Sequence, residues 1–516
     1  MTTVTNPILP GCYPDPSICR VGDDYYLVTS TFEYFPGLPI HHSRDLVSWT
    51  QIGSAIDREG QLDMAGVPSS GGLYAPTLRH HNGVFWIACT MVDSSDRSRG
   101  GNFLLTATDP AGPWSDPIWL EGGGIDPSLF FDDDGRMWVH GTRLVLDPPW
   151  HDQTEVWVRE LDPQTMSFVG DEHILWNGAL LGAVWAEAPH LYKIGDFYYL
   201  LTAEGGTDLH HAVSVARSEH VTGPYVGNRA NPVLTHRNLG RTADIVGVGH
   251  ADLVEAVDGS WWAVLLAMRP YGGYHYNLGR ETFLVPVEWE DGWPIFAPGV
   301  GQVSPTLEVP GSAAVQLAPQ AGPVGPDDPR WTSLRGPVTA FATPQGDGWR
   351  LALQPVTLAQ RLTPTFLGVR QQHVDVDVTA TIRPRTRLPH EHVGLVLRQS
   401  EGDHATVYVA PGPDGGMVVR AAHRRSGDET VLAETPLELS SDGTVTLMVR
   451  ARGQEYSLAV ETPSGTETLA VVDGRELDPV TVGGFLGLWM GVYATSNGQP
   501  SDATADVVTF DYRPGA

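Results

Sequence analysis

The chain has 516 residues, of which 41% are hydrophobic, and its 32 basic and 61 acidic residues give a net charge of −29. A chain of this length predicts two or more domains, since one domain averages about 150 residues. The negative charge argues against nucleic acid and anionic membranes as partners, because both would repel the protein.

The N-terminal residues carry no basic region followed by an apolar run, which is the pattern of a secretory signal. No apolar stretch is long enough for a membrane span. Three cysteines are too few for a disulfide framework in a chain of this size. We therefore expect a cytoplasmic protein that acts on small imported molecules.

One phrase recurs five times in the first 265 residues: an acidic residue or Ala, then Pro, any residue, and Ile or Leu, followed by a turn and an aromatic strand. The copies begin at Asp15, Ala75, Asp126, Ala188 and Ala251, the last of them without Pro. These starting points, here called heads, lie 60, 51, 62 and 63 residues apart. Repeats of this length with several strands each predict a five-bladed β-propeller over residues 1–300.

Three acidic residues occupy related places in this repeat. Asp15 and Asp126 begin the first and third copies, and Glu187 directly precedes the fourth head. One Asp-Pro pair is a common turn, but packing gives no reason for an acid at three heads. Equivalent positions on propeller blades lie on a ring about the axis, so the three carboxyl groups are expected to share one cavity. Such a cavity suits glycoside hydrolysis, which needs one protonated acid and one carboxylate base.

The second half of the chain changes character after the last repeat. Residues 301–329 are rich in Pro, Gly and Ala and are typical of a linker. Residues 330–516 contain short alternating strands separated by charged loops, which predict a β-sandwich of the jelly-roll or concanavalin-like kind. The predicted fold class is therefore all-β, with a propeller followed by a sandwich.

Several segments, in this order, resemble glycoside hydrolase family 43, in the branch of β-xylosidases and α-L-arabinofuranosidases that carry an appended sandwich. The matching segments are residues 6–17 (NPILPGCYPDPS), 30–37 (STFEYFPG), 125–128 (IDPS), 187–192 (EAPHLY) and 278–282 (LGRET). The likeness extends into the C-terminal sandwich and so covers nearly the whole chain. A set of five ordered motifs is specific for the family.

The resemblance implies a role for each acid. It makes Asp15 the general base that activates water and Glu187 the general acid that protonates the leaving oxygen. Asp126 would position the acid and raise its pKa, as a neighbouring like charge does. Arg280, in Leu-Gly-Arg-Glu-Thr, resembles the substrate-binding arginine of the family.

The same resemblance implies further pocket residues. Phe32 and Tyr74 would form the wall for the terminal sugar, with Tyr74 where many related xylosidases have Trp, and Thr207 matches another pocket position. Trp489 aligns with an aromatic residue that closes the pocket in relatives, in some of them from a neighbouring subunit, so a homo-oligomer is one expectation. No cofactor is expected to be required, but His250 matches a residue with which some relatives hold a cation, commonly calcium, through water molecules in the central channel.

The predicted activity is that of an inverting, exo-acting hydrolase that releases a terminal β-D-xylose or α-L-arabinofuranose from xylo-oligosaccharides or arabinoxylan fragments. Sequence leaves the choice between the two pentoses open. Two alternatives are a non-catalytic glycan-binding propeller, which would need no acids at three heads, and a retaining fructan hydrolase, whose Arg-Asp-Pro and Glu-Cys motifs we do not find. For an inverting enzyme, the carboxyl groups of Asp15 and Glu187 are expected to lie about 6.5–9.5 Å apart.

Overall fold

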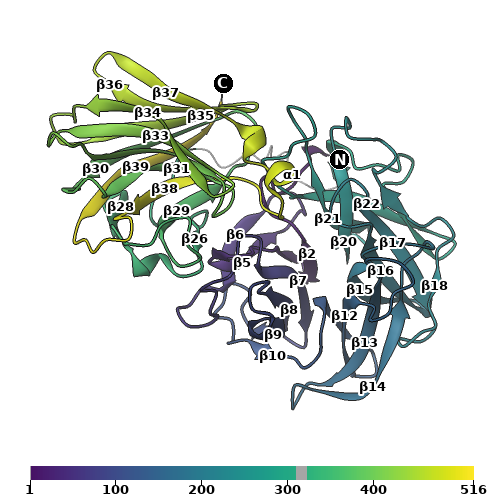
Figure 1. The fold of residues 1–516 in the computed structure, drawn as a ribbon. Coiled ribbons are helices and arrows are strands. Elements are labelled where there is room, and N and C mark those ends of the chain that lie inside the picture. The colour runs from purple at the N-terminus through teal and green to yellow at the C-terminus, as the bar shows by residue number, and fades with distance from the viewer. Residues whose placement is uncertain (1, 310–321, 516) are drawn as a thin grey trace.

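The computed structural model describes residues 2–309 and 322–515, and nearly all their regular structure is β-strand. Helices in this part of the chain are limited to α1 (Pro479–Val482) and the 3-10 turns η1 (Arg97–Arg99), η2 (Val338–Ala340) and η3 (Gly474–Glu476). A ring of small sheets and a pair of larger sheets pack side by side (Figure 1). The predicted all-β class, with a propeller followed by a sandwich, is confirmed.

Five antiparallel sheets form the ring, one for each repeat of the sequence. In chain order the blades are β2 (Ser17–Val21), β3 (Asp24–Val28), β5 (Gly37–Ser43) and β6 (Thr50–Ile56); β7 (Gly72–His81), β8 (Val84–Val92), β9 (Gly101–Ala107) and β10 (Ile118–Trp119); β11 (Ile125–Phe131), β12 (Met137–Leu144), β13 (Thr154–Asp162) and β14 (Ser167–Trp176); β15 (Glu187–Ile194), β16 (Phe197–Glu204), β17 (Ala212–Ser218), β18 (Val226–Gly227) and β19 (Leu234–Thr235); and β20 (Val246–Glu255), β21 (Trp261–Met268), β22 (Glu281–Glu290) and β23 (Trp293–Phe296). The strands β2, β7, β11, β15 and β20 contact one another and are the innermost ones.

Every blade bends at its head. The head residues, Asp15, Ala75, Asp126, Ala188 and His250, all have a positive φ between 36° and 56°. In four of the blades the strand pairing also shifts register there, as in a β-bulge. A bulge turns a side chain out of the regular alternation of the strand, so the repeated phrase marks the point where each blade directs a residue toward the axis. The fifth head is His250, which corrects the predicted Ala251 by one residue.

Apolar side chains fill the interfaces between neighbouring blades. Leu104 and Val139 pack between the second and third blades, and Leu201 and Leu265 pack between the fourth and fifth. Blade strands are buried on both faces by such neighbours, which explains why β8 and β21 are almost continuously hydrophobic.

A buried ion pair ties the blades at the axis. Arg79 of β7 donates to both oxygens of Asp252 of β20, at 2.8 and 3.1 Å. The Ser17 hydroxyl donates to Asp252 at 2.6 Å, and the Tyr192 hydroxyl does so at 2.5 Å. These contacts join the first, second, fourth and fifth blades just past their heads.

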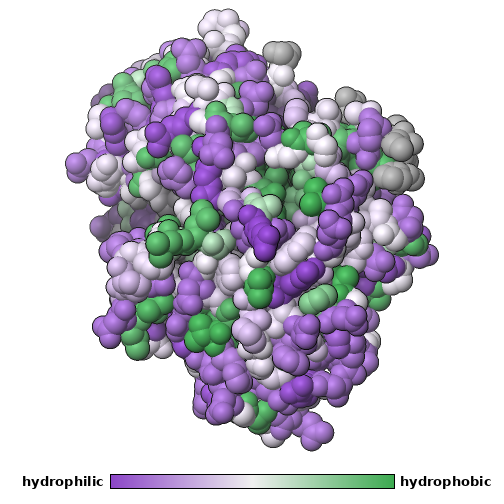
Figure 2. Space-filling view, turned by 90° about the vertical axis from the view of Figure 1, so that its right-hand side faces the viewer, coloured by the Kyte–Doolittle hydropathy of each residue, from purple (hydrophilic) through white to green (hydrophobic). Residues whose placement is uncertain are grey.

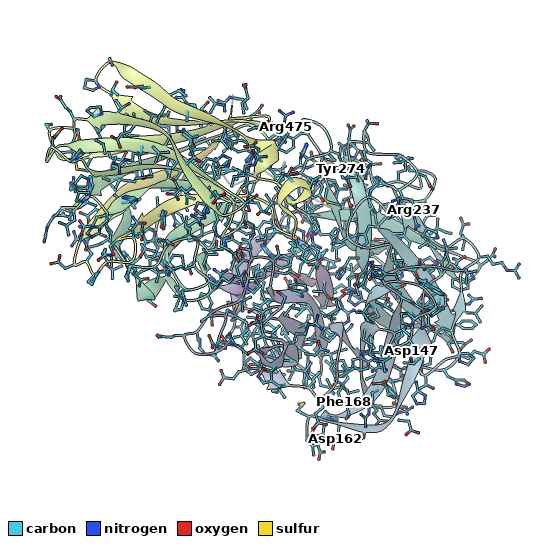
Figure 3. The ribbon with its side chains drawn as sticks, viewed as in Figure 1. Asp147, Asp162, Phe168, Arg237, Tyr274 and Arg475 are labelled. Carbon is cyan, nitrogen blue, oxygen red and sulfur yellow. The ribbon has the colours of Figure 1, made fainter. Side chains whose placement is uncertain are left out.

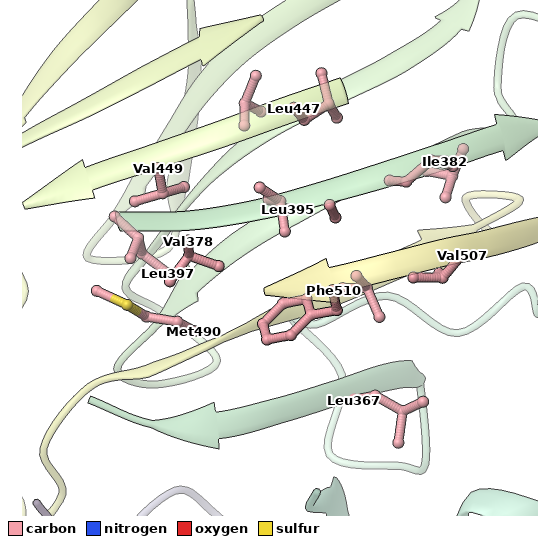
Figure 4. Close-up of a cluster of buried hydrophobic side chains, with 14 of the residues drawn as sticks. Leu367, Val378, Ile382, Leu395, Leu397, Leu447, Val449, Met490, Val507 and Phe510 are labelled. Carbon is pink, nitrogen blue, oxygen red and sulfur yellow. The ribbon is translucent and has the colours of Figure 1, made fainter. Parts of the chain in front are cut away.

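The second body is a two-layered sandwich. One sheet has the order β27 (Ala342–Gln345), β28 (Gly348–Ala352), β39 (Thr504–Pro514), β30 (Val376–Pro384), β35 (Val445–Arg452), β36 (Glu455–Thr462) and β37 (Gly465–Asp473), with β25 (Gly322–Pro323) paired to β39. The other has the order β29 (Thr365–Arg370), β38 (Trp489–Thr495), β31 (His392–Arg398), β32 (His404–Pro411), β33 (Met417–Arg425) and β34 (Asp428–Leu437). Alternate residues of β30, such as Val378 and Ile382, face the core, where they meet Leu395 and Leu447 (Figure 4).

Residues 301–309 and 322–329 of the predicted linker are described, whereas residues 310–321 lie outside the described part of the chain. Within it, β24 (Thr306–Val309) pairs with the first strand of the chain, β1 (Thr2–Thr5). Just past it, β26 (Ser333–Leu334) pairs with β4 (Tyr34–Phe35) of the propeller region. Strand pairing therefore fastens the linker region to the propeller.

The sandwich also contacts the propeller through buried side chains. The Arg398 guanidinium lies 3.2 Å from a Glu33 carboxylate oxygen and donates to the Tyr34 hydroxyl at 2.7 Å. Both members of this ion pair have fully buried side chains. Separation of the two bodies would expose an ion pair and aromatic surface, so the two are expected to form one unit.

The surface of the propeller side is mainly hydrophilic with separate hydrophobic patches (Figure 2). Phe168 lies at the outer end of the third blade, whereas Tyr274 lies beside the sandwich (Figure 3). Within residues 2–309 and 322–515, no helix is long and apolar enough to cross a membrane.

Candidate active site

A small cavity of about 90 Å³ lies where the five heads converge and the sandwich approaches. All five blades contribute to it. Its lining consists of Asp15, Phe32, Tyr74, Ala75, Ile125, Asp126, Glu187, Ala203, Thr207, His211, His250, Arg280 and, from the sandwich, Phe485. The structure therefore brings together the three acids and every other predicted site residue except Trp489.

Asp15 is surrounded by groups that favour its ionised form. Arg280 Nη1 donates to Oδ1 at 2.8 Å, and the Ser30 hydroxyl donates to Oδ2 at 2.6 Å. His250 Nδ1 lies 3.5 Å from Oδ1. Burial raises the pKa of Asp15, but Arg280, His250 and the Ser30 hydrogen bond outweigh it, so the pKa lies below its ordinary value. Asp15 is thus a carboxylate able to accept a proton.

Glu187 and Asp126 have the opposite surroundings. Burial is the main cause that raises the pKa of both, and repulsion from neighbouring carboxylates raises it further, from Asp15 on Asp126 and from both aspartates on Glu187. The backbone N–H of Ala188 donates to Asp126 Oδ2 at 3.1 Å, which links the third and fourth heads. Coupled carboxyl groups titrate as a pair, and a pair with raised pKa values retains a proton near neutral pH.

Arg280 is the buried cation of the cavity. Besides its contact with Asp15, Nη1 donates to the Thr207 hydroxyl at 3.1 Å. Its guanidinium carbon lies 5.6 Å from the ring centre of Phe32 and 5.2 Å from that of Phe485. Its buried Nε has no hydrogen-bond partner among the described residues, which is uncommon for a buried polar atom.

Three aromatic rings form one wall of the cavity. Phe32 meets Tyr74 edge-on at 5.3 Å and stacks on Phe485 at 6.0 Å, and Tyr74 meets Phe485 edge-on at 5.8 Å. The Tyr74 hydroxyl is fixed because it donates to the Ser70 carbonyl. A rigid apolar wall opposite carboxyl groups suits a sugar ring, which has both apolar C–H faces and polar edges.

Trp489 does not reach the cavity, which corrects its predicted place. It is only 1% exposed, its ring stacks on Tyr34 at 3.8 Å, and its Nε1 donates to the Thr332 hydroxyl at 3.0 Å. Trp489 begins β38 and pairs on both sides with neighbouring strands, so its ring is confined to the interface between the two domains. Phe485 lies in the loop before this strand and supplies the aromatic ring instead.

His250 lines the cavity, but its neighbours do not form a direct calcium site. Calcium prefers about six to eight oxygen ligands. The nearest carboxylate, Asp15, already binds Arg280, and Asp252 binds Arg79. In the described part of the chain, no group of three or more His, Cys, Asp or Glu side chains is arranged to hold a metal ion.

Sequence reasoning missed two polar residues that shape the site, Ser30 and His211. Ser30 holds Asp15 and also accepts from the backbone N–H of Ala75, although it lies in a segment that carried the family resemblance. His211 packs against Gly249, where a Cβ atom would lie 2.4 Å from the imidazole. Burial lowers the pKa of His211 to about 3, so the ring is neutral. In the sequence, Gly249 directly before His250 was the signal from which the contact with His211 could have been inferred.

A propeller cavity that gathers an ionised carboxylate with a carboxyl pair that retains a proton contains the two groups that a glycoside hydrolase needs. Residues 4–294 match the family described as glycosyl hydrolases family 43, and residues 327–513 match the β-xylosidase C-terminal concanavalin A-like domain. The chain therefore belongs to glycoside hydrolase family 43.

Related proteins align with nearly the whole chain. A Butyrivibrio fibrisolvens protein named xylosidase/arabinosidase is 40% identical, with 99% of each chain covered. A non-reducing end α-L-arabinofuranosidase of Bacteroides ovatus is 39% identical over 99% of this chain and 95% of its own. The crystal structure of a xylan β-1,4-xylosidase from Bacillus halodurans matches with a TM-score of 0.91 at 31% identity, over 99% of this chain and 100% of its own.

Proposed function

We propose that the protein releases single terminal pentoses, β-D-xylose or α-L-arabinofuranose, from xylo-oligosaccharides or arabinoxylan fragments, with inversion at the anomeric carbon. The observation that carries this proposal is the convergence, in one small cavity, of Asp15 bound to Arg280 with the carboxyl groups of Asp126 and Glu187. The names of the relatives support both pentoses.

Each carboxyl group has a distinct task in the proposed mechanism. Asp15 takes a proton from a water molecule as that water attacks the anomeric carbon. Glu187 gives its proton to the glycosidic oxygen as the bond to the aglycone breaks. Burial raises the pKa of Glu187, and Asp126 raises it further through like-charge repulsion.

Arg280 and the aromatic wall would orient the sugar between the two carboxyl groups. Arg280 keeps Asp15 ionised and lies against the rings of Phe32 and Phe485 in the cavity. Phe32, Tyr74 and Phe485 would cover the apolar face of the ring. A single displacement needs room for a water beside the sugar, which is the reason for the expected separation of about 6.5–9.5 Å between Asp15 and Glu187.

A panel of nitrophenyl pentosides tests the proposal, with β-D-xylopyranoside and α-L-arabinofuranoside as the main substrates. Proton NMR of the first-formed sugar should show the inverted anomer. Binding of pentosides without hydrolysis would favour the glycan-binding alternative, and a first product of retained configuration would overturn the inverting mechanism.

A further inference from the structure

The turn just before β7 is bonded to every segment that carries a ring of the aromatic wall. Ser70 lies in this turn, which is closed by a hydrogen bond of 2.9 Å from the backbone N–H of Gly71 to the Pro68 carbonyl. Among the described residues, those that line the cavity do not include Ser70. Its N–H, its carbonyl and its hydroxyl nonetheless each bond to a different part of the wall.

Each of these three bonds leads to one ring. The N–H of Ser70 donates at 3.1 Å to Oε2 of Glu33, the residue that follows Phe32. The Ser70 carbonyl accepts from the Tyr74 hydroxyl. The Ser70 hydroxyl accepts from the backbone N–H of Phe485 at 2.9 Å. One residue outside the cavity therefore connects the two rings of the propeller with the ring of the sandwich.

The backbone at Ser70 favours glycine rather than serine. Its φ is 64°, in the left-handed region, where Gly is the usual residue. The loop that carries Phe485 also comes close, since a Cβ atom at Gly484 would lie 2.4 Å from the Ser70 hydroxyl oxygen. A serine at this position thus supplies an acceptor for the Phe485 N–H that a glycine would lack.

The sandwich also holds the neighbouring residue of the turn. The Ser69 hydroxyl accepts from Arg398 Nη2 at 2.9 Å, and the Ser69 N–H donates to a Glu401 carboxylate oxygen at 3.0 Å. Arg398 in turn lies 3.2 Å from Glu33, which binds the Ser70 N–H. The turn is therefore fixed between the two domains, at the point where their rings meet.

We propose that Ser70 is a positioning residue for the terminal sugar. Its hydroxyl fixes the loop of Phe485 against Phe32 and Tyr74, so that the wall has its shape before a sugar binds. The wall covers the same face of the sugar before and during bond cleavage, so a loosened wall weakens binding more than it slows cleavage. This inference rests on the proposed pentosidase function and names a residue on which its sugar affinity depends.

Ser70→Gly tests the role of the hydroxyl. Glycine suits the left-handed backbone, so the bonds of the N–H to Glu33 and of the carbonyl to Tyr74 can persist. Loss of one hydrogen bond should raise KM for nitrophenyl pentosides about three- to tenfold, with kcat nearly unchanged. The inhibition constant of the released pentose, D-xylose or L-arabinose, should rise by the same factor, and the Tm should change little.

Tyr74→Phe is a second variant, which keeps the ring and removes its bond to the Ser70 carbonyl. It should also raise KM, and the double variant should show less than the product of the two effects, because both act on one wall. The matched control is Ser426→Gly, in the exposed turn between β33 and β34, where φ is also positive at 48°. The control should leave KM and kcat unchanged.

Unchanged KM and inhibition constants in Ser70→Gly would overturn the inference, whether or not the Tm falls, because Ser70 would then serve domain packing alone. A loss confined to kcat, or an equal rise of KM in Ser426→Gly, would also overturn it. Each of these results leaves the proposed function intact. Wild-type enzyme that hydrolyses no pentoside would instead refute the proposed function and the inference with it.

Discussion

At the scale of single residues, Asp15 and Glu187 face the same cavity but differ in charge because of their nearest neighbours. Burial, and after it repulsion from neighbouring carboxylates, raises the pKa of Glu187, so it is expected to carry the proton that the leaving oxygen needs. Glu187→Gln should fold normally and lose about 10²–10⁴-fold in kcat on oligosaccharides. Nitrophenyl substrates should lose less, because their leaving group needs little protonation. Equal losses on both substrate types would remove Glu187 from the role of acid.

Asp15→Asn should nearly abolish hydrolysis of every substrate, since no leaving group compensates for a water that is not activated. Added azide provides the check. A glycosyl azide of retained configuration would mark Asp15 as a nucleophile and contradict its assignment as a base.

The pH dependence follows from the same two groups. Activity needs Asp15 ionised. Because the pKa of Asp15 is lowered, the acid limb of the pH–activity profile should lie below the ordinary pKa range of aspartate. Activity also needs Glu187 protonated, and its raised pKa places the alkaline limb above the ordinary range of glutamate. Asp126→Asn removes a like charge, so the pKa of Glu187 should fall and the alkaline limb should move to lower pH. A profile of kcat/KM against pH measures this, and an unmoved alkaline limb would contradict it.

The acids could be predicted from sequence because a repeat reveals which positions share the axis. Phe485 could not, because its place depends on how a loop of the sandwich lies against the propeller. Trp489 was the more prominent aromatic residue in that segment, but a residue inside a strand that pairs on both sides has no freedom to reach the cavity.

At the scale of elements, a blade can be predicted from sequence where the bend at its head is marked by the repeated phrase that contains Pro. The fifth copy lacks Pro, and without that marker its head was placed one residue late, at Ala251 instead of His250. The register shift between Gly249 and Asp252 fixes the correct place. Contacts between blades, such as that of Arg79 with Asp252, join residues far apart in sequence and leave no local pattern.

The axial ion pair should be a major source of stability for the blade ring. Arg79→Met would leave Asp252 buried with its charge partly uncompensated, which costs about 3–5 kcal/mol. The double variant Arg79→Met/Asp252→Leu should recover part of this loss, since neither charge then stays buried. Urea unfolding measures the free energy of unfolding of the single and the double variant. Arg387→Met, which breaks an exposed pair with Asp502, is the control and should change stability by about 1 kcal/mol or less. A double variant no more stable than the single one would contradict this view.

At the scale of the whole molecule, the all-β class and both domains could be predicted from repeats and strand alternation. The way in which they pack could not, because it depends on the Arg398–Glu33 pair and on the ring of Tyr34 under Trp489. These residues are more than 360 positions apart in the first case and more than 450 in the second. Packing between the domains nonetheless completes the cavity, since Phe485 comes from the sandwich.

The residues that line the cavity include the three acids, Arg280 and the aromatic wall. Because each role in the proposed mechanism is filled by one of these groups, we predict that catalysis does not require a neighbouring subunit. We expect kcat per chain to stay constant across a dilution series in which light scattering follows the mass of the particle. Phe485→Ala provides the internal comparison, because it should lower kcat/KM at every concentration by removing one ring of the wall. Activity that falls in step with dissociation of an oligomer would show that a second chain completes the site.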